Sequence, residues 1–161
     1  MVRAKEAKIS ALVYVAAAIA ICFFDVPLEK VGICKGRALG PRLLHPFFHA
    51  SFLHAIVNGW VLLSLVFIFD TTFIELLLAY VAAVTVPVSL LGITIPTVGA
   101  SGAIYFLCGY HSWRNRNKWK WHAWWAFFIG IGFFFPASNA LLHLWCYAVG
   151  VAVGFLNTPL K

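Results

Sequence analysis

Charged side chains are scarce in this sequence. Of its 161 residues only 11% are Asp, Glu, Lys or Arg, whereas 63% are hydrophobic and 17% aromatic, and a soluble domain carries roughly 25% charged residues. The scarcity argues against a soluble domain and predicts a polytopic membrane protein. Because each crossing needs about 20 residues, the length suits one all-α domain over residues 1–161, a bundle of six membrane-spanning helices joined by short loops.

Carboxylates are the rarest charged groups. The five acids are Glu6, Asp25, Glu29, Asp70 and Glu75, against 12 basic residues, and the net charge is +7. An excess of this sign can attract nucleic acid, but basic residues beside apolar segments more often report orientation in a bilayer. We therefore expect a lipid bilayer as a partner and no nucleic acid.

Cysteines at metal or redox spacing are absent. Cys22, Cys34, Cys108 and Cys146 form no CxxC pair and lie in or near apolar segments, which predicts buried thiols. A disulfide between Cys22 and Cys34 stays open at this stage. We expect no metal and no cofactor.

Apolar runs are present in the number that six spans require. Proline, glycine and polar clusters separate them, and the expected helices cover residues 9–24, 46–69, 73–91, 101–113, a run ending at Phe135, and 139–157. Asp70-Thr71-Thr72 predicts a tight turn with a helix N-cap. The fourth helix rises only ~20 Å in a core of ~30 Å, so Ser101 at its start should lie inside the membrane depth.

The basic residues predict the orientation of these spans. Six spans put both termini on one side, and that side holds eight basic residues, namely Arg3, Lys5, Lys8, Arg114, Arg116, Lys118, Lys120 and Lys161. The other side holds four, namely Lys30, Lys35, Arg37 and Arg42. The excess of positive charge predicts cytoplasmic termini and places Ser101 toward the outer face of a cell membrane.

Histidine and asparagine side chains interrupt two of the apolar runs. His49, His54 and Asn58 lie in the second, and His143 lies near the start of the sixth. Polar groups at membrane depth are costly and usually functional. His54 and Asn58 are four residues apart and share a helix face, and the depths of these side chains match that of Ser101. We expect Ser101, His143, His54 and Asn58 to occupy one layer.

This layer has the parts of a serine hydrolase. A serine needs a base such as a neutral histidine, and the oxyanion needs preorganised donors. Ser101 and His143 supply the first pair, while His54, Asn58 and the free N–H groups of a helix start supply donors. None of the five acids lies where it can reach His143, so we expect a Ser–His dyad. Tyr105, one turn after Ser101, is a candidate for packing against the histidine ring.

The motifs resemble those of the rhomboid family of intramembrane serine proteases. The resemblance rests on Gly-x-Ser-Gly-x-x-Tyr at 99–105 followed by Gly109-Tyr110, on His-x4-His-x3-Asn at 49–58, and on His143 with Gly150 and Gly154. It covers nearly the whole chain. One difference is Cys146, at a position often occupied by glycine in the family.

The resemblance implies a function. It makes Ser101 the nucleophile, His143 the base, and His54, Asn58 and the Ser101 N–H the oxyanion donors, with His49 as a further binding residue. The implied substrates are peptide bonds in or near transmembrane segments of other membrane proteins, and the implied substrate gate is the fifth helix with the Pro136 loop. Gly99 would allow the turn into the short helix, and Gly102 would let another helix approach. The oligomeric state stays open.

Two other classes of function remain as alternatives. One is a membrane protein that binds a transition metal or haem through His45, His49, His54 and His143, since neutral imidazoles suit such metals. The other is a non-catalytic rhomboid-like module that binds transmembrane helices. Inactive relatives typically lose the serine or the histidine, and both are present here.

Overall fold

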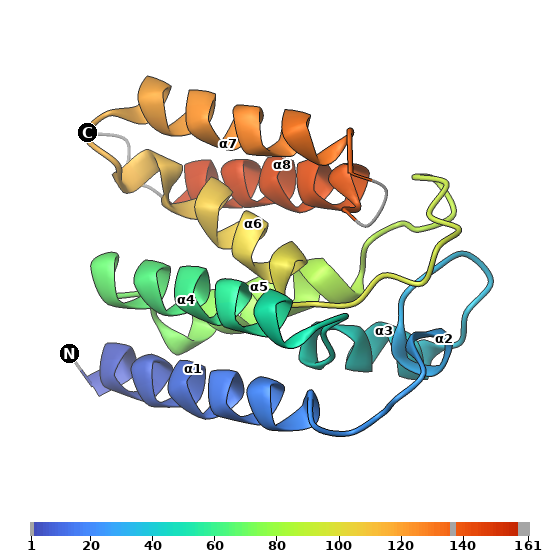
Figure 1. Cartoon of the computed structure of the whole chain (residues 1–161). Helices are drawn as coiled ribbons and strands as arrows, with labels where there is room; N and C mark the ends of the chain where they lie inside the picture. The colour runs from blue at the N-terminus through green and yellow to red at the C-terminus, as the bar shows by residue number, and fades with distance from the viewer. Residues whose placement is uncertain (1, 136–137, 158–161) are drawn as a thin grey trace.

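The regular elements of the protein are helical. The computed structural model describes residues 2–135 and 138–157, and within them a single β-bridge, between Ile33 and Thr97, is the sole strand-like contact (Figure 1). The elements in chain order are α1 Val2–Ile21, α2 Leu28–Val31, α3 Leu39–Leu44, the 3-10 helix η1 His45–Phe47, α4 Phe52–Ile68, α5 Phe73–Val84, α6 Ser101–Tyr110, the 3-10 helix η2 His111–Arg114, α7 Lys118–Gly132 and α8 Ala140–Asn157. The expected all-α class is confirmed for this part of the chain.

The expectation of six membrane-spanning helices is wrong. Over residues 2–135 and 138–157, α8 alone is long and apolar enough to cross a membrane. A second span is counted only if residues 39–47 and 52–68, which meet at 79°, form one broken segment. The expected multi-pass location, with cytoplasmic termini and an outward-facing site, rested on six spans and is corrected with them.

The other long helices do not meet the length or the apolar composition that a membrane span needs. α1 has 20 residues, but its first turns carry Lys5, Glu6 and Lys8. α5 has 12 residues and ends at Val84, so it rises only ~18 Å. It ends there because the residue before a proline disfavours helical backbone, and Pro87 follows closely. α6 and α7 have 10 and 15 residues.

Helix boundaries also differ from those expected. α4 begins at Phe52 instead of Pro46, because the Ser51 hydroxyl accepts a hydrogen bond from the His54 N–H at 3.1 Å and caps the helix there. The loop at 25–45 contains α2 and α3. Thr72 caps α5 in a capping box with Glu75, which confirms the predicted turn.

Pro136, in the loop expected to form part of a substrate gate, lies outside the described residues. The four cysteines are free, so Cys22 and Cys34 do not pair.

The most extensive helix pair is α6 with α8, at the centre of the structure (Figure 1). Small residues let these two backbones approach closely. A Cβ added at Gly150 would lie 2.8 Å from the carbonyl carbon of Phe106 and closer still to its oxygen, and one added at Gly102 would lie 3.4 Å from Cys146 Sγ. Cys146 therefore fits opposite Gly102 without separating the helices. This contact sets the position of the α6 start relative to α8.

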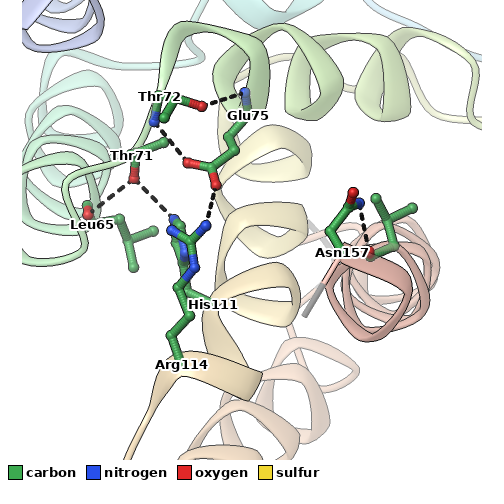
Figure 2. Close-up of polar contacts among 8 residues, drawn as sticks. Leu65, Thr71, Thr72, Glu75, His111, Arg114 and Asn157 are labelled. Carbon is green, nitrogen blue, oxygen red and sulfur yellow. Dashed lines mark hydrogen bonds and ion pairs between the residues drawn. The ribbon is translucent and has the colours of Figure 1, made fainter. Parts of the chain in front are cut away.

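A buried polar cluster joins α5 to η2 at the other end of α6 (Figure 2). Glu75, of which 5% is exposed, binds Arg114 at 2.6 Å, and His111 Nε2 lies 2.9 Å from Thr71 Oγ1. Thr71 donates its hydroxyl proton to the Leu65 carbonyl at 3.3 Å, so the His111 Nε2–H is the donor to Thr71. Burial lowers the pKa of His111 from its ordinary 6.5 to about 4, although the Glu75 carboxylate opposes the shift. His111 is thus neutral near pH 7.

Candidate active site

Ser101 is the first residue of α6, and the turn before it depends on glycine. Gly99 has φ +119°, a conformation that side chains rarely adopt. A Cβ there would also lie 2.9 Å from His54 Cε1 and 3.2 Å from Asn58 Nδ2. Gly99 therefore brings the chain against the α4 side chains and starts α6 immediately afterwards, as the sequence suggested.

The turn is held from behind by two histidines. The Gly99 N–H donates to the His45 carbonyl at 2.9 Å, and the Ala100 N–H donates to His49 Nε2 at 3.4 Å. His49 is 9% exposed and packs edge to face against His54, with ring centroids 5.0 Å apart. His49 thus supports the backbone that carries Ser101 and does not line its cavity.

Ser101 and His143 form a hydrogen-bonded pair. His143, in the first turn of α8, places Nε2 2.9 Å from Ser101 Oγ. The Tyr105 ring lies under the imidazole, with centroids 4.3 Å apart and planes inclined by 17°. In the described part of the chain no carboxylate bonds to His143. The pairing and the stacking involve the three residues that the sequence suggested, and the stacked Tyr105 ring fixes the orientation of the imidazole.

Hydrogen-bond donors face the same place. Asn58 is 8% exposed, and its Nδ2 has no hydrogen-bond partner among the described residues. It lies against the Gly99 turn beside Ser101. The first N–H groups of α6 have no acceptor within the helix, because every helix start leaves such groups free. An unpaired buried donor costs free energy, and the Asn58 amide lines the same cavity as Ser101, so it is free to donate to an acceptor there.

These groups open onto one cavity of about 820 Å³. Ser101, His143, His54, Asn58 and Tyr105 line it together with the loop 91–98 and the end of α7. The cavity therefore brings together the predicted nucleophile, base and both α4 donors. His49 faces a smaller neighbouring cavity of about 380 Å³.

The sequence did not predict the contacts that hold the cavity-lining loop 91–98 in place. The loop 91–98 is held by the bridge of Thr97 to Ile33, with N···O distances of 2.9 and 3.1 Å, and by Asn139 Nδ2, which donates to Thr97 Oγ1 at 3.1 Å. Asn139 also caps α8, accepting from the Leu142 N–H at 3.1 Å. An asparagine directly before an apolar run is a cap signal, but the bridge has no local signal.

The histidines do not gather as a metal centre. Within residues 2–135 and 138–157, no three His, Cys, Asp or Glu side chains are placed to hold a metal ion. His45 Nδ1 instead lies 2.8 Å from the Arg42 carbonyl oxygen. The alternative of a site formed by His45, His49, His54 and His143 therefore gains no support from the geometry.

No protein-family model, curated protein or solved structure matches the chain.

Proposed function

We propose that the chain is a serine endopeptidase of the rhomboid type, which hydrolyses peptide bonds in or near transmembrane segments of other proteins. The observation that carries the proposal is the 2.9 Å contact of Ser101 Oγ with His143 Nε2, in a cavity that also holds the unpaired Asn58 donor. A nucleophile, a base and a hydrogen-bond donor in one cavity are the parts that acyl transfer needs.

The proposed reaction has two stages. Ser101 Oγ attacks the scissile carbonyl while His143 Nε2 takes its proton, and the oxyanion accepts hydrogen bonds from Asn58, His54 and the Ser101 N–H. His143 then protonates the leaving amine as the C–N bond breaks, which leaves an acyl ester on Ser101. A water molecule attacks this ester while its proton passes to His143. The bond from the acyl carbon to Ser101 Oγ then breaks, His143 returns the proton to Oγ, and the acid product leaves.

The surface of the cavity and its surroundings supports the proposed substrate class. Ile95 and Phe135 line the cavity and are 64% and 60% exposed. Exposed apolar side chains recur on the outer faces of the helices, including Leu53 and Trp60 on α4, which are 69% and 75% exposed. Exposed apolar surface of this extent indicates contact with lipid or with another protein. We therefore propose a lipid bilayer and apolar transmembrane segments as the partners.

The test is cleavage of a single-span membrane protein by the purified full chain. Ser101→Ala and His143→Ala should each lower the rate by at least about 1,000-fold. Matched controls are Ser112→Ala and His122→Ala, whose side chains bond to the Gly109 carbonyl and the Tyr147 hydroxyl away from the cavity. They should retain near wild-type rates.

Two outcomes would overturn the proposal. Retained cleavage in either dyad variant would exclude the dyad. A folded wild-type protein that binds the substrate segment and never cleaves it would favour the non-catalytic module.

A further inference from the structure

The connection between η2 and α7, together with the first turn of α7, carries a cationic surface. We call it the basic segment and define it as Arg116, Lys118, Trp119 and Lys120. All four side chains are exposed, and Trp119 is 86% exposed. Lys118 Nζ lies 5.2 Å from the Trp113 ring centroid. The ion pairs of the described residues are Lys8 with Asp70 and Arg114 with Glu75. The three cations of the basic segment therefore have no carboxylate partner in that part of the chain.

The position of Lys118 and Lys120 in the first turn of α7 is electrostatically unfavourable. α7 begins at Lys118, its N-cap Asn117 makes no side-chain capping bond, and its first turn contains no acid. A helix N-terminus carries partial positive charge, so it favours anions and disfavours lysine. No acid in the first turn of α7 offsets the repulsion between Lys118, Lys120 and the helix end, so anions from outside would relieve it.

The surroundings of the basic segment identify the source of those anions. The charge of Arg114 is paired with Glu75 within the protein, so Arg114 is not counted among the cations of the basic segment (Figure 2). Beyond the cations, α7 exposes Trp124, Phe127 and Phe128, which are 61%, 54% and 48% exposed. Charge, then tryptophan, then phenylalanine is the order expected across a bilayer interface, from headgroups to hydrocarbon. A nucleic acid offers no apolar layer for these rings.

We propose that the basic segment binds the anionic phospholipid headgroups of a bilayer, with Trp119 inserted at the same level. The segment lies at the end of the molecule where α1 begins and α8 ends, whereas the first turn of α6 points the other way (Figure 1). The inference rests on the bilayer of the proposed function and is independent of the Ser101–His143 dyad. Each Lys or Arg close to an anionic phospholipid surface raises the affinity for that surface by a factor of about five.

The experiment titrates the detergent-solubilised full chain with dioleoylphosphatidylglycerol or dioleoylphosphatidylcholine and counts retained lipid by native mass spectrometry. The test variant is Arg116→Gln/Lys118→Gln/Lys120→Gln. The matched control, Lys30→Gln/Lys35→Gln/Arg37→Gln, removes the same charge from exposed residues elsewhere. Wild type should prefer phosphatidylglycerol, and the test variant should lose about 100-fold of that preference. The control should stay within about twofold, and Lys120→Gln alone should lose about fivefold.

Several results would overturn the inference. These are equal retention of the two lipids by wild type, an unchanged preference in the test variant, or an equal loss in the control, which would make net charge the cause. Tighter binding of a duplex DNA or RNA oligonucleotide than of phosphatidylglycerol, abolished in the test variant, would assign the segment to nucleic acid. Because hydrolysis is not measured, failure here leaves the proposed function standing.

Discussion

Gly150→Ala should separate α6 from α8 and disable the dyad without touching either of its members. The added Cβ would lie 2.8 Å from the Phe106 carbonyl carbon and 3.0 Å from Phe106 Cα, and closer still to the carbonyl oxygen. Ordinary van der Waals contact begins at 3.4 Å. Both neighbours are backbone atoms of α6, so no side chain can move aside and one helix must shift.

The size of the shift predicts the size of the effect. Relief of these contacts needs a separation of about 1 Å, and a displacement of about 1 Å in a catalytic pair costs on the order of 100-fold in rate. The Ser101 to His143 distance of 2.9 Å would exceed hydrogen-bonding range after such a movement. Overpacking of this kind also destabilises a protein by about 1 to 3 kcal/mol.

The assay measures kcat and KM for cleavage of the single-span substrate, together with the thermal unfolding midpoint in detergent. Gly130→Ala on α7 is the matched control, because a Cβ there has nothing within 4 Å. We expect Gly150→Ala to lower kcat by about 100-fold and Gly130→Ala to leave it unchanged. A folded Gly150→Ala protein with kcat within twofold of wild type would refute the idea that this helix contact positions the dyad.

Two further predictions concern the buried donor and the distal cluster. Asn58→Ala should lower kcat at least about tenfold with little change in KM, because the donor acts on the oxyanion; an unchanged kcat would leave Asn58 a packing role. His111 has a folded pKa of about 4, below its unfolded 6.5, so the unfolded state takes up the proton first and wild-type stability should fall as the pH drops from about 6.5 to about 4. Thermal midpoints of wild type and His111→Gln across this range should converge at low pH, and parallel curves would contradict the assigned pKa.

Local signals in the sequence predicted the parts of the site that local chemistry determines. The Gly99 turn that leads into α6 and the cap at Thr72 each depend on residues a few positions apart. The stacking of Tyr105 on His143 joins α6 to α8 and is not local. The pairing of Ser101 with His143 spans 42 residues and was suggested by matching positions within two apolar runs and by the family motifs. Their catalytic roles stay predictions.

The hydropathy of the sequence did not predict where the helices begin and end. The run 46–69 reads as one helix, yet the Ser51 cap starts α4 only at Phe52. The run 73–91 reads as another, yet α5 ends at Val84. An apolar run does not reveal where backbone hydrogen bonding stops, so the number of spans was overestimated. Contacts such as Ala100 N–H to His49 and Arg114 to Glu75 join distant residues and have no local pattern.

The most direct test of the central claim is labelling of the folded full chain with a fluorophosphonate, followed by mass spectrometry of the modified peptide. The probe reacts with a serine only when a base activates it. The account predicts labelling at Ser101 in wild type and none in His143→Ala, with Ser112→Ala labelled like wild type. Labelling at another serine, or equal labelling of Ser101 when His143 is absent, would contradict it.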